Sequence, residues 1–325
     1  MLYNTPMNNF WHQLACNHHP FLALAPMEGV TDYVFREMIA RIAPPEVMFT
    51  EFTNTEALFS KGYAHTIPRF RFSDKQRPVI AQIWGTDLKN FFRAARLIKE
   101  LGFDGIDINM GCPDRSVVKL GCGAALINNQ PLAAAMIAAV RDGAPGLPVS
   151  VKTRLGIKSL TTEPWIRFLL EQHPDAITIH GRTAKELSRV PVHWDEIGKA
   201  VKLRDRYSPS TVIVGNGGIL SRKQAKSIHE MYGVDGVMIG TGIFENPWVF
   251  EETPKEHTNK ELLSLLLLHT RRYADCYPGE RRFTAMRKYF KIYVHSFSGA
   301  ATLMKQLMST TNYAEVELCV RAYLK

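Results

Sequence analysis

The sequence predicts an α/β fold: a (β/α)8 barrel of parallel strands followed by a small C-terminal helical bundle. Eight apolar runs of strand length recur between residues 21 and 241, segments with helical periodicity separate them, and the pattern becomes wholly helical after residue 252. Crossover helices cover such a barrel and bury every strand, which explains why the runs are continuously apolar. An open, doubly wound sheet is the alternative, but it usually has fewer strands and a GxGxxG turn after the first.

The predicted strands are, in order, FLALAPM, EVMFTEF, VIAQIWG, GIDINMG, VSVKTRL, AITIHG, VIVGNG and GVMIGT. Helix signals lie between them. DLKNFFRAARLIKELG is amphipathic, Pro131 suits the first turn of a helix, and Ser221 with Gln224 has capping-box spacing. We therefore assign residues 1–20 to an N-terminal extension and residues 21–252 to the barrel.

Residues 253–325 form the predicted helical tail, which begins with the polar linker EETPKEHT. Its periodicity and capping signals predict helices over 259–277, 280–296, 299–309 and 312–324. The tail has twelve Lys and Arg against six Asp and Glu, in a chain whose net charge is +9. Basic residues interleaved with aromatic ones favour a polyanionic partner such as nucleic acid, although a merely solvated surface carries the same charges.

The number and spacing of the cysteines and the hydropathy limit the classes of protein to which this chain can belong. The five cysteines form no CxxC pair and no zinc spacing, so we expect neither disulfides nor a structural metal. The longest apolar run, LLSLLLL at 262–268, is much shorter than a transmembrane helix, and the first twenty residues do not resemble a signal peptide. We expect a cytoplasmic protein with no metal, no membrane association and no implied protein partner.

Polar residues end nearly every predicted strand, at the barrel rim where active sites of this fold lie. Buried polar groups are unfavourable unless they are satisfied, so their convergence predicts a ligand with many acceptors, although each residue alone has a structural explanation. Glycines after the seventh and eighth strands predict a phosphate site. A phosphorylated planar cofactor such as FMN fits, with Lys152 as a cation near the flavin.

Six motifs resemble the tRNA-dihydrouridine synthase family: LAPMEGVTD (24–32), INMGCPDRSVVKLGCGAALI (108–127), SVKTRLG (150–156), IHGRT (179–183), GNGGI (215–219) and MIGTGIFENPWVF (238–250). The resemblance covers residues 21–250, and the basic tail is similar to the family's RNA-binding domain. APMEGV and TEF resemble the bacterial C-type subfamily most. The resemblance implies an FMN-dependent enzyme that uses NADPH, or NADH, to reduce the C5–C6 bond of a uracil in tRNA.

The resemblance also implies roles for individual residues. Cys112 would protonate C5 after hydride addition at C6, a role that suits a thiol because it is mostly protonated at neutral pH. The uridine and the tRNA would be bound by Asn109, Arg154, Arg182, Arg287 and Lys288. FMN would be held by Pro26, Met27, Glu28, Gln82, Lys152, His180, Asn216, Gly217, Gly218, Gly240 and Thr241.

Thr241, Gly218 and Val118 depart from the family's usual residues, which bears on FMN binding and on the catalytic loop. Two other interpretations stay open from the sequence alone. One is a flavin barrel similar to dihydroorotate dehydrogenase that acts on a small molecule. The other is a tRNA-binding protein without redox activity.

Overall fold

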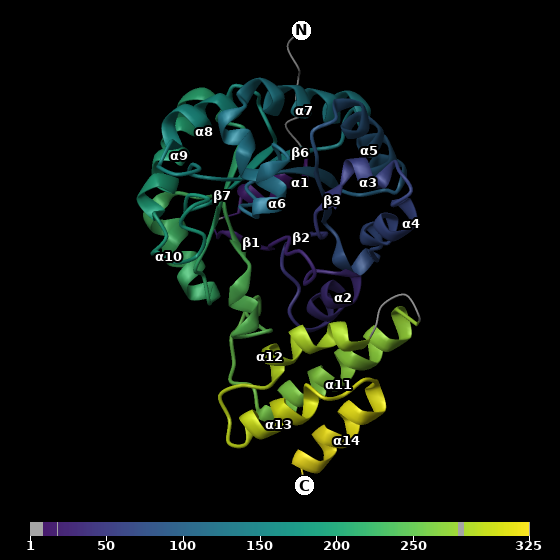
Figure 1. Cartoon of the computed structure of the whole chain (residues 1–325). Coiled ribbons are helices and arrows are strands. Elements are labelled where there is room, and N and C mark those ends of the chain that lie inside the picture. Colours follow the sequence, from purple (N-terminus) through teal and green to yellow (C-terminus); the bar gives the residue numbers. More distant parts are fainter. Residues whose placement is uncertain (1–8, 18, 279–282, 325) are drawn as a thin grey trace.

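The computed structural model describes residues 9–17, 19–278 and 283–324, and its larger part is a closed barrel (Figure 1). All eight predicted strands are present: β1 (Phe21–Leu24), β2 (Val47–Phe49), β4 (Val79–Trp84), β5 (Gly105–Met110), β6 (Val149–Arg154), β7 (Ala176–His180), β8 (Val212–Asn216) and β9 (Gly236–Ile239). Their pairings are parallel, and the β1–β9 and β2–β4 pairs leave no free edge among these eight strands. The barrel is confirmed and the open sheet is excluded.

The strand register brings the polar strand ends to one level of the rim. Asn109 of β5 lies opposite Lys152 of β6, and Arg154 lies opposite His180 of β7. His180 in turn lies opposite Asn216 of β8. Because parallel strands all end on the same side, these side chains face a common space above the barrel interior.

Six longer helices cover the outside of the barrel: α2 (Tyr33–Ile42), α5 (Leu88–Glu100), α7 (Gln130–Gly143), α8 (Thr162–Leu170), α9 (Trp194–Tyr207) and α10 (Arg222–Tyr232). In α5, Phe91, Ala95 and Ile98 are buried at helical spacing, as the amphipathic pattern predicts. Pro131 occupies the first turn of α7, and the Ser221 side chain accepts a hydrogen bond from the Gln224 amide at the start of α10.

Short elements extend the strand ends. Between β2 and β4 the chain forms β3 (Thr53–Asn54), α3 (Thr55–Leu58), α4 (Tyr63–Thr66), η1 (Ile67–Phe70) and η2 (Asp74–Gln76). After β5 it forms α6 (Arg115–Lys119) and η3 (Gly123–Asn128), and after β9 it forms η4 (Thr241–Phe244). Apart from η2, which leads into the N-terminal end of β4, these segments build the loops of the rim, on which the active sites of this fold are carried.

The N-terminal extension contains a helix that closes the bottom of the barrel, α1 (Phe10–Ala15). Trp11 is buried against strand residues of the barrel, with ring centroids 5.8 Å from Phe21 and 6.4 Å from Phe49. Asn9 caps the helix and its side chain also donates to Asp175 at 2.5 Å. Residues 1–8 and 18 of the predicted extension lie outside the described residues.

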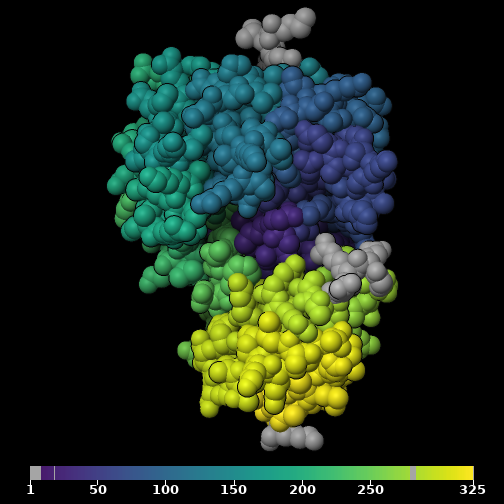
Figure 2. Space-filling model, viewed as in Figure 1, coloured from purple at the N-terminus to yellow at the C-terminus, as the bar shows by residue number. Residues whose placement is uncertain are grey.

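The tail is helical, as predicted, and lies beside α2 (Figures 1 and 2). Its helices are α11 (Asn259–Cys276), η5 (Phe283–Tyr289), α12 (Phe290–Tyr293), α13 (Ala300–Leu307) and α14 (Tyr313–Tyr323). Thr258 and Glu261 form the predicted capping box of α11. The expected continuous helix over 280–296 is wrong within the described residues: a 3-10 turn precedes a short α-helix, which ends where Val294 leaves the helical conformation. Residues 280–282 lie outside the described residues.

No single helix of the described residues is long and apolar enough to cross a membrane. Segments 115–128 and 130–143 meet that criterion only when joined across a 95° bend. In the same part of the chain, no group of three or more His, Cys, Asp or Glu side chains is arranged to hold a metal.

Candidate active site

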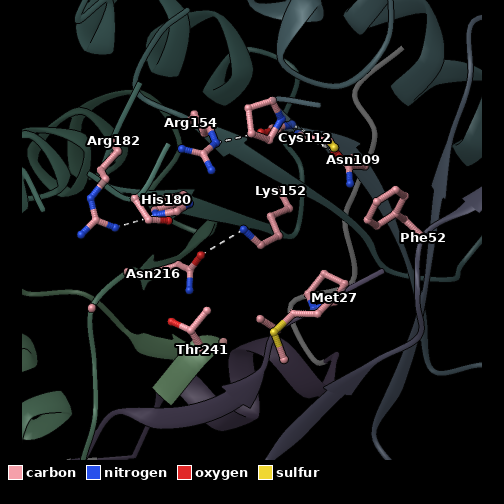
Figure 3. A pocket seen from close by; sticks show the side chains of 18 of the residues that line it. Met27, Phe52, Asn109, Cys112, Lys152, Arg154, His180, Arg182, Asn216 and Thr241 are labelled. Atoms are coloured by element: carbon pink, nitrogen blue, oxygen red, sulfur yellow. Dashed lines mark hydrogen bonds between the residues drawn. The ribbon is translucent and has the colours of Figure 1, made fainter. Parts of the chain in front are cut away.

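A cleft of about 360 Å³ opens at the C-terminal ends of the barrel strands (Figure 3). It collects most of the predicted site residues from eight strand ends and their loops. The lining comprises Ala25, Pro26, Met27, Phe52, Gln82, Asn109, Gly111, Cys112, Pro113, Lys152, Arg154, His180, Arg182, Ser188, Asn216, Gly217, Gly218, Ile219, Gly240, Thr241 and Gly242. Figure 3 shows Lys152 near the centre of the cleft, with Met27 and Thr241 on one side and Cys112 on another.

A chain of side-chain amides holds one wall of the cleft. The fully buried Asp107 accepts hydrogen bonds from Ser150 and from Gln82 Nε2, both at 2.7 Å. Gln82 Oε1 accepts from Asn109 Nδ2 at 3.0 Å, and Asn109 Oδ1 accepts from the Cys112 amide at 2.9 Å. Because an ionised carboxylate only accepts, Asp107 fixes the direction of every amide in this chain. Sequence reasoning missed Asp107. The signal that could have identified it is a carboxylate inside the buried strand run GIDINM.

Cys112 lies just beyond β5, on a backbone that is held from two sides. Its amide donates to Asn109, and its carbonyl accepts from the Ala124 amide at 3.0 Å. Arg154 Nε donates to the neighbouring Gly111 carbonyl at 2.9 Å. Burial is the main cause that raises the pKa of the Cys112 thiol above its ordinary value of 9.0, so the group is a protonated thiol at neutral pH. It can therefore act as a proton donor in the cleft.

The cleft carries three cations, Lys152, Arg154 and Arg182, that form no close ion pair in the part of the chain that the structure describes. Within the described residues, no carboxylate oxygen lies within 4.0 Å of the charged nitrogens of Lys152, Arg154 or Arg182. Burial, and then the charge of Arg154, lower the pKa of Lys152 to about 8. Lys152 Nζ donates to Asn216 Oδ1 at 3.1 Å (Figure 3). Buried cations are stable when anionic or electron-rich groups approach them, so this cleft is built for such a ligand.

His180 stands between these cations as a neutral imidazole. Burial and the charges of Arg154, Lys152 and Arg182 lower its pKa to about 2. Its Nε2 faces Arg182 Nη1 at 3.1 Å, where the neutral ring accepts a hydrogen bond. His180 therefore offers a hydrogen-bonding edge without adding charge.

Arg154 and Arg182 are anchored by backbone carbonyls. Arg154 Nη1 donates to the carbonyls of Thr183 and Leu187, and Arg182 Nε donates to that of Val190 at 2.6 Å. These contacts tie the loop after β7 to the rim. Sequence reasoning missed this loop's Ser188, and it also missed Phe52, which lines the cleft at the end of the second strand segment.

Three predicted site residues lie outside the cleft. Glu28 forms a bidentate ion pair with Arg69, with contacts of 2.5 and 2.7 Å, and lines an adjacent cavity of about 590 Å³. Arg287 and Lys288 belong to η5 of the tail. Arg287 donates to the Thr310 carbonyl at 3.1 Å, and Lys288 Nζ lies 4.9 Å from the centre of the Tyr289 ring.

Comparison with known proteins decides the family. The sequence model of the dihydrouridine synthase (Dus) family matches residues 23–325, which includes the tail. The chain belongs to the dihydrouridine synthase family. A probable tRNA-dihydrouridine synthase of Staphylococcus aureus (strain COL) is 45% identical over 310 residues, which are 94% of this chain and 93% of that protein. The probable tRNA-dihydrouridine synthase 2 of Bacillus subtilis (strain 168) is 43% identical over 311 residues, 95% and 94% of the two chains.

Solved structures support the fold of this dihydrouridine synthase family member. Morphinone reductase in complex with tetrahydroNAD superposes with a TM-score of 0.50 at 12% identity, over 73% of this chain and 87% of that chain. At this identity the likeness concerns the barrel architecture alone.

Proposed function

We propose that this protein is an FMN-dependent tRNA-dihydrouridine synthase, which uses NADPH to reduce the C5–C6 bond of a uridine in tRNA. Its family membership and its close relatives named as tRNA-dihydrouridine synthases support the reaction. The observation that carries the proposal is the cleft itself, where a protonated thiol shares one pocket with cations that have no carboxylate oxygen within 4.0 Å among the described residues. Such a cleft suits an anionic planar cofactor and a substrate that needs a proton.

The residues of the cleft fit FMN. Gly217 has φ +126°, and a Cβ there would lie 3.0 Å from Val192 and 3.2 Å from His180 Nε2, so only glycine keeps the backbone open to a ligand. We assign the phosphate to the glycine segments at Gly217–Gly218 and Gly240–Thr241, and the isoalloxazine ring to Pro26, Met27, Gln82, Lys152, His180 and Asn216. Bound FMN would supply the hydride that adds to C6 of uracil.

The chain's own residues then complete the reaction. Lys152 would supply a cation to the flavin ring, which becomes negative on reduction. Asn109 and Arg182 present N–H groups to the uracil, and Cys112 Sγ gives its proton to C5. Solvent restores the thiol proton. The net change is one hydride and one proton added across the double bond.

The substrate is a base inside a folded RNA, so it must be flipped into the cleft. The basic tail supports this step: Lys288 lies beside the barrel, with its Nζ 3.5 Å from the point where a Cβ of Gly29 would be. We assign Lys288 and its neighbour Arg287 in η5 to contacts with the RNA backbone. A tRNA substrate supports a cytoplasmic location, which is part of the proposal.

The test is anaerobic stopped-flow absorbance of the purified holoprotein. The flavin is first reduced with NADPH and then mixed with unmodified tRNA, for wild type, Cys112→Ala and Cys122→Ala. Cys122 is the matched control, because its buried Sγ contacts the Leu120 carbonyl at 3.7 Å and does not line the cleft. We expect dihydrouridine and rapid flavin reoxidation in wild type and Cys122→Ala, with a loss of about 10²- to 10⁴-fold in Cys112→Ala. Protein that contains no flavin, or reduced flavin that does not react with tRNA, would refute the proposal.

A further inference from the structure

The helical tail contacts the loop that forms one side of the cleft, and a buried hydroxyl group lies at this contact. Tyr289, the last residue of η5, is fully buried between the tail and the barrel. Its hydroxyl lies 3.2 Å from the Gly29 carbonyl, 2.9 Å from the Val30 carbonyl and 2.9 Å from Asp32 Oδ2. All three acceptors belong to the segment that follows β1.

The backbone of this segment is held by hydrogen bonds between its own residues and by hydrogen bonds from Arg36 and Tyr289. The Met27 carbonyl accepts from the amides of Val30 and Thr31, and the Thr31 carbonyl accepts from Arg36 at 2.6 Å. The Gly29 and Val30 carbonyls face the tail instead, where Tyr289 meets them. A hydroxyl can donate to one acceptor at a time or share its proton between them, so Tyr289 joins two carbonyls and the Asp32 cap of α2 at one point.

The same segment carries residues of the proposed cofactor site. Pro26 and Met27 line the cleft, and Figure 3 shows Met27 next to Thr241. Met27 is separated from Gly29, whose φ is +70°, by one residue. A hydrogen bond that holds the Gly29 and Val30 carbonyls therefore restrains the turn on which Met27 is presented.

Ring packing makes the contact rigid. Phe35 of α2 stacks on Tyr289 with centroids 5.6 Å apart, and His269 of α11 meets the ring edge at 4.7 Å. Lys288, assigned above to the RNA, lies next to Tyr289 in the chain, and its Nζ lies 3.5 Å from the point where a Cβ of Gly29 would be. The turn at Lys288 and Tyr289 thus contacts the 26–32 loop and also carries Lys288, which is proposed to bind the RNA.

We propose that Tyr289 is a positioning residue, whose hydroxyl lets the tail hold the 26–32 loop in the conformation that binds the flavin. The part that concerns the flavin rests on the proposed function, whereas the restraint on the loop does not. The expected consequence is a tail that acts on cofactor retention as well as on RNA binding.

Tyr289→Phe removes the hydroxyl and keeps the ring. The matched control is Tyr293→Phe, because Tyr293 is also buried in the tail but its hydroxyl pairs with His269 Nδ1 at 2.9 Å and not with a carbonyl of the loop. Hydrogen–deuterium exchange of the 26–32 backbone amides measures the restraint without any activity assay. Release of FMN from diluted holoprotein, followed by flavin fluorescence, measures retention.

We expect faster exchange at Val30 and Thr31 and about tenfold weaker FMN retention in Tyr289→Phe, with neither change in Tyr293→Phe. The tRNA dissociation constant should be the same in both variants. Equal loop exchange in the two variants would overturn the proposal, and so would equal FMN retention. A wild-type protein that never binds FMN would refute the proposed function instead, while the exchange experiment would still decide whether Tyr289 restrains the loop.

Discussion

Replacing Asp107 with asparagine isolates the effect of one charge inside the barrel. Asp107 is fully buried, and burial raises its pKa from an ordinary 3.8 to about 6 despite the hydrogen bonds from Ser150 and Gln82. Asparagine has the same shape and can keep both bonds, because its Oδ1 accepts from Gln82 and its Nδ2 donates to the Ser150 hydroxyl. The substitution therefore removes the charge and leaves the packing.

The sign and size of the effect follow from proton linkage. The folded state holds the Asp107 proton more tightly than the unfolded state does, so the free energy of unfolding falls as pH rises from about 4 through about 6. The whole difference corresponds to about 3 kcal/mol, of which roughly half is lost between about pH 5 and about pH 8. Asp107→Asn does not suffer this loss. Relative to wild type, the variant should gain about 1 kcal/mol between these two pH values.

Urea unfolding of both proteins at the two pH values measures this difference, since titrating groups other than the coupled Lys152 contribute equally to both. Asp74→Asn is the control, because the Asp74 side chain is 95% exposed. A stability difference between wild type and Asp107→Asn that is the same at both pH values would refute the reasoning. The Asp107 charge also raises the pKa of Lys152, so loss of that charge should move any activity that depends on the Lys152 cation to lower pH.

Three further predictions concern the cleft and the barrel. Lys152, whose pKa is lowered to about 8, should set an alkaline limb near that pH in the rate of flavin reduction by NADPH, and Lys152→Arg should move the limb upward. Gly123 has φ +59°, and a Cβ there would lie 2.7 Å from the Cys112 carbonyl oxygen, so Gly123→Ala should slow the tRNA-dependent step at least about tenfold. Gly146→Ala, at φ +82° in open space, should leave that step unchanged. Trp11→Ala should lower the free energy of unfolding by about 3–5 kcal/mol in urea titrations, and a loss below about 1 kcal/mol would show that α1 does not close the barrel.

The bundle and the barrel differ in how far the sequence predicts them. The barrel strands are found in full, because each is buried on both faces and its apolar run has sharp polar ends. In the tail, α11 and α14 follow from capping pairs, whereas Phe283–Tyr293 forms η5 and α12 instead of a continuous helix. Here Met286, Tyr289, Phe290 and Tyr293 are all buried, so packing against neighbouring elements overrides local helix propensity.

The sequence by itself determined the barrel, the basic tail, the family resemblance and most residues of the cleft, because strand ends of a parallel barrel converge wherever they occur along the chain. Only the tertiary structure decided which side chains pair. It placed Glu28 against Arg69 outside the cleft, joined Asp107 to Cys112 through two amides, and brought Tyr289 to the loop at Gly29. These contacts connect residues far apart in the sequence, and they depend on side-chain distances and directions that no local pattern of residues contains.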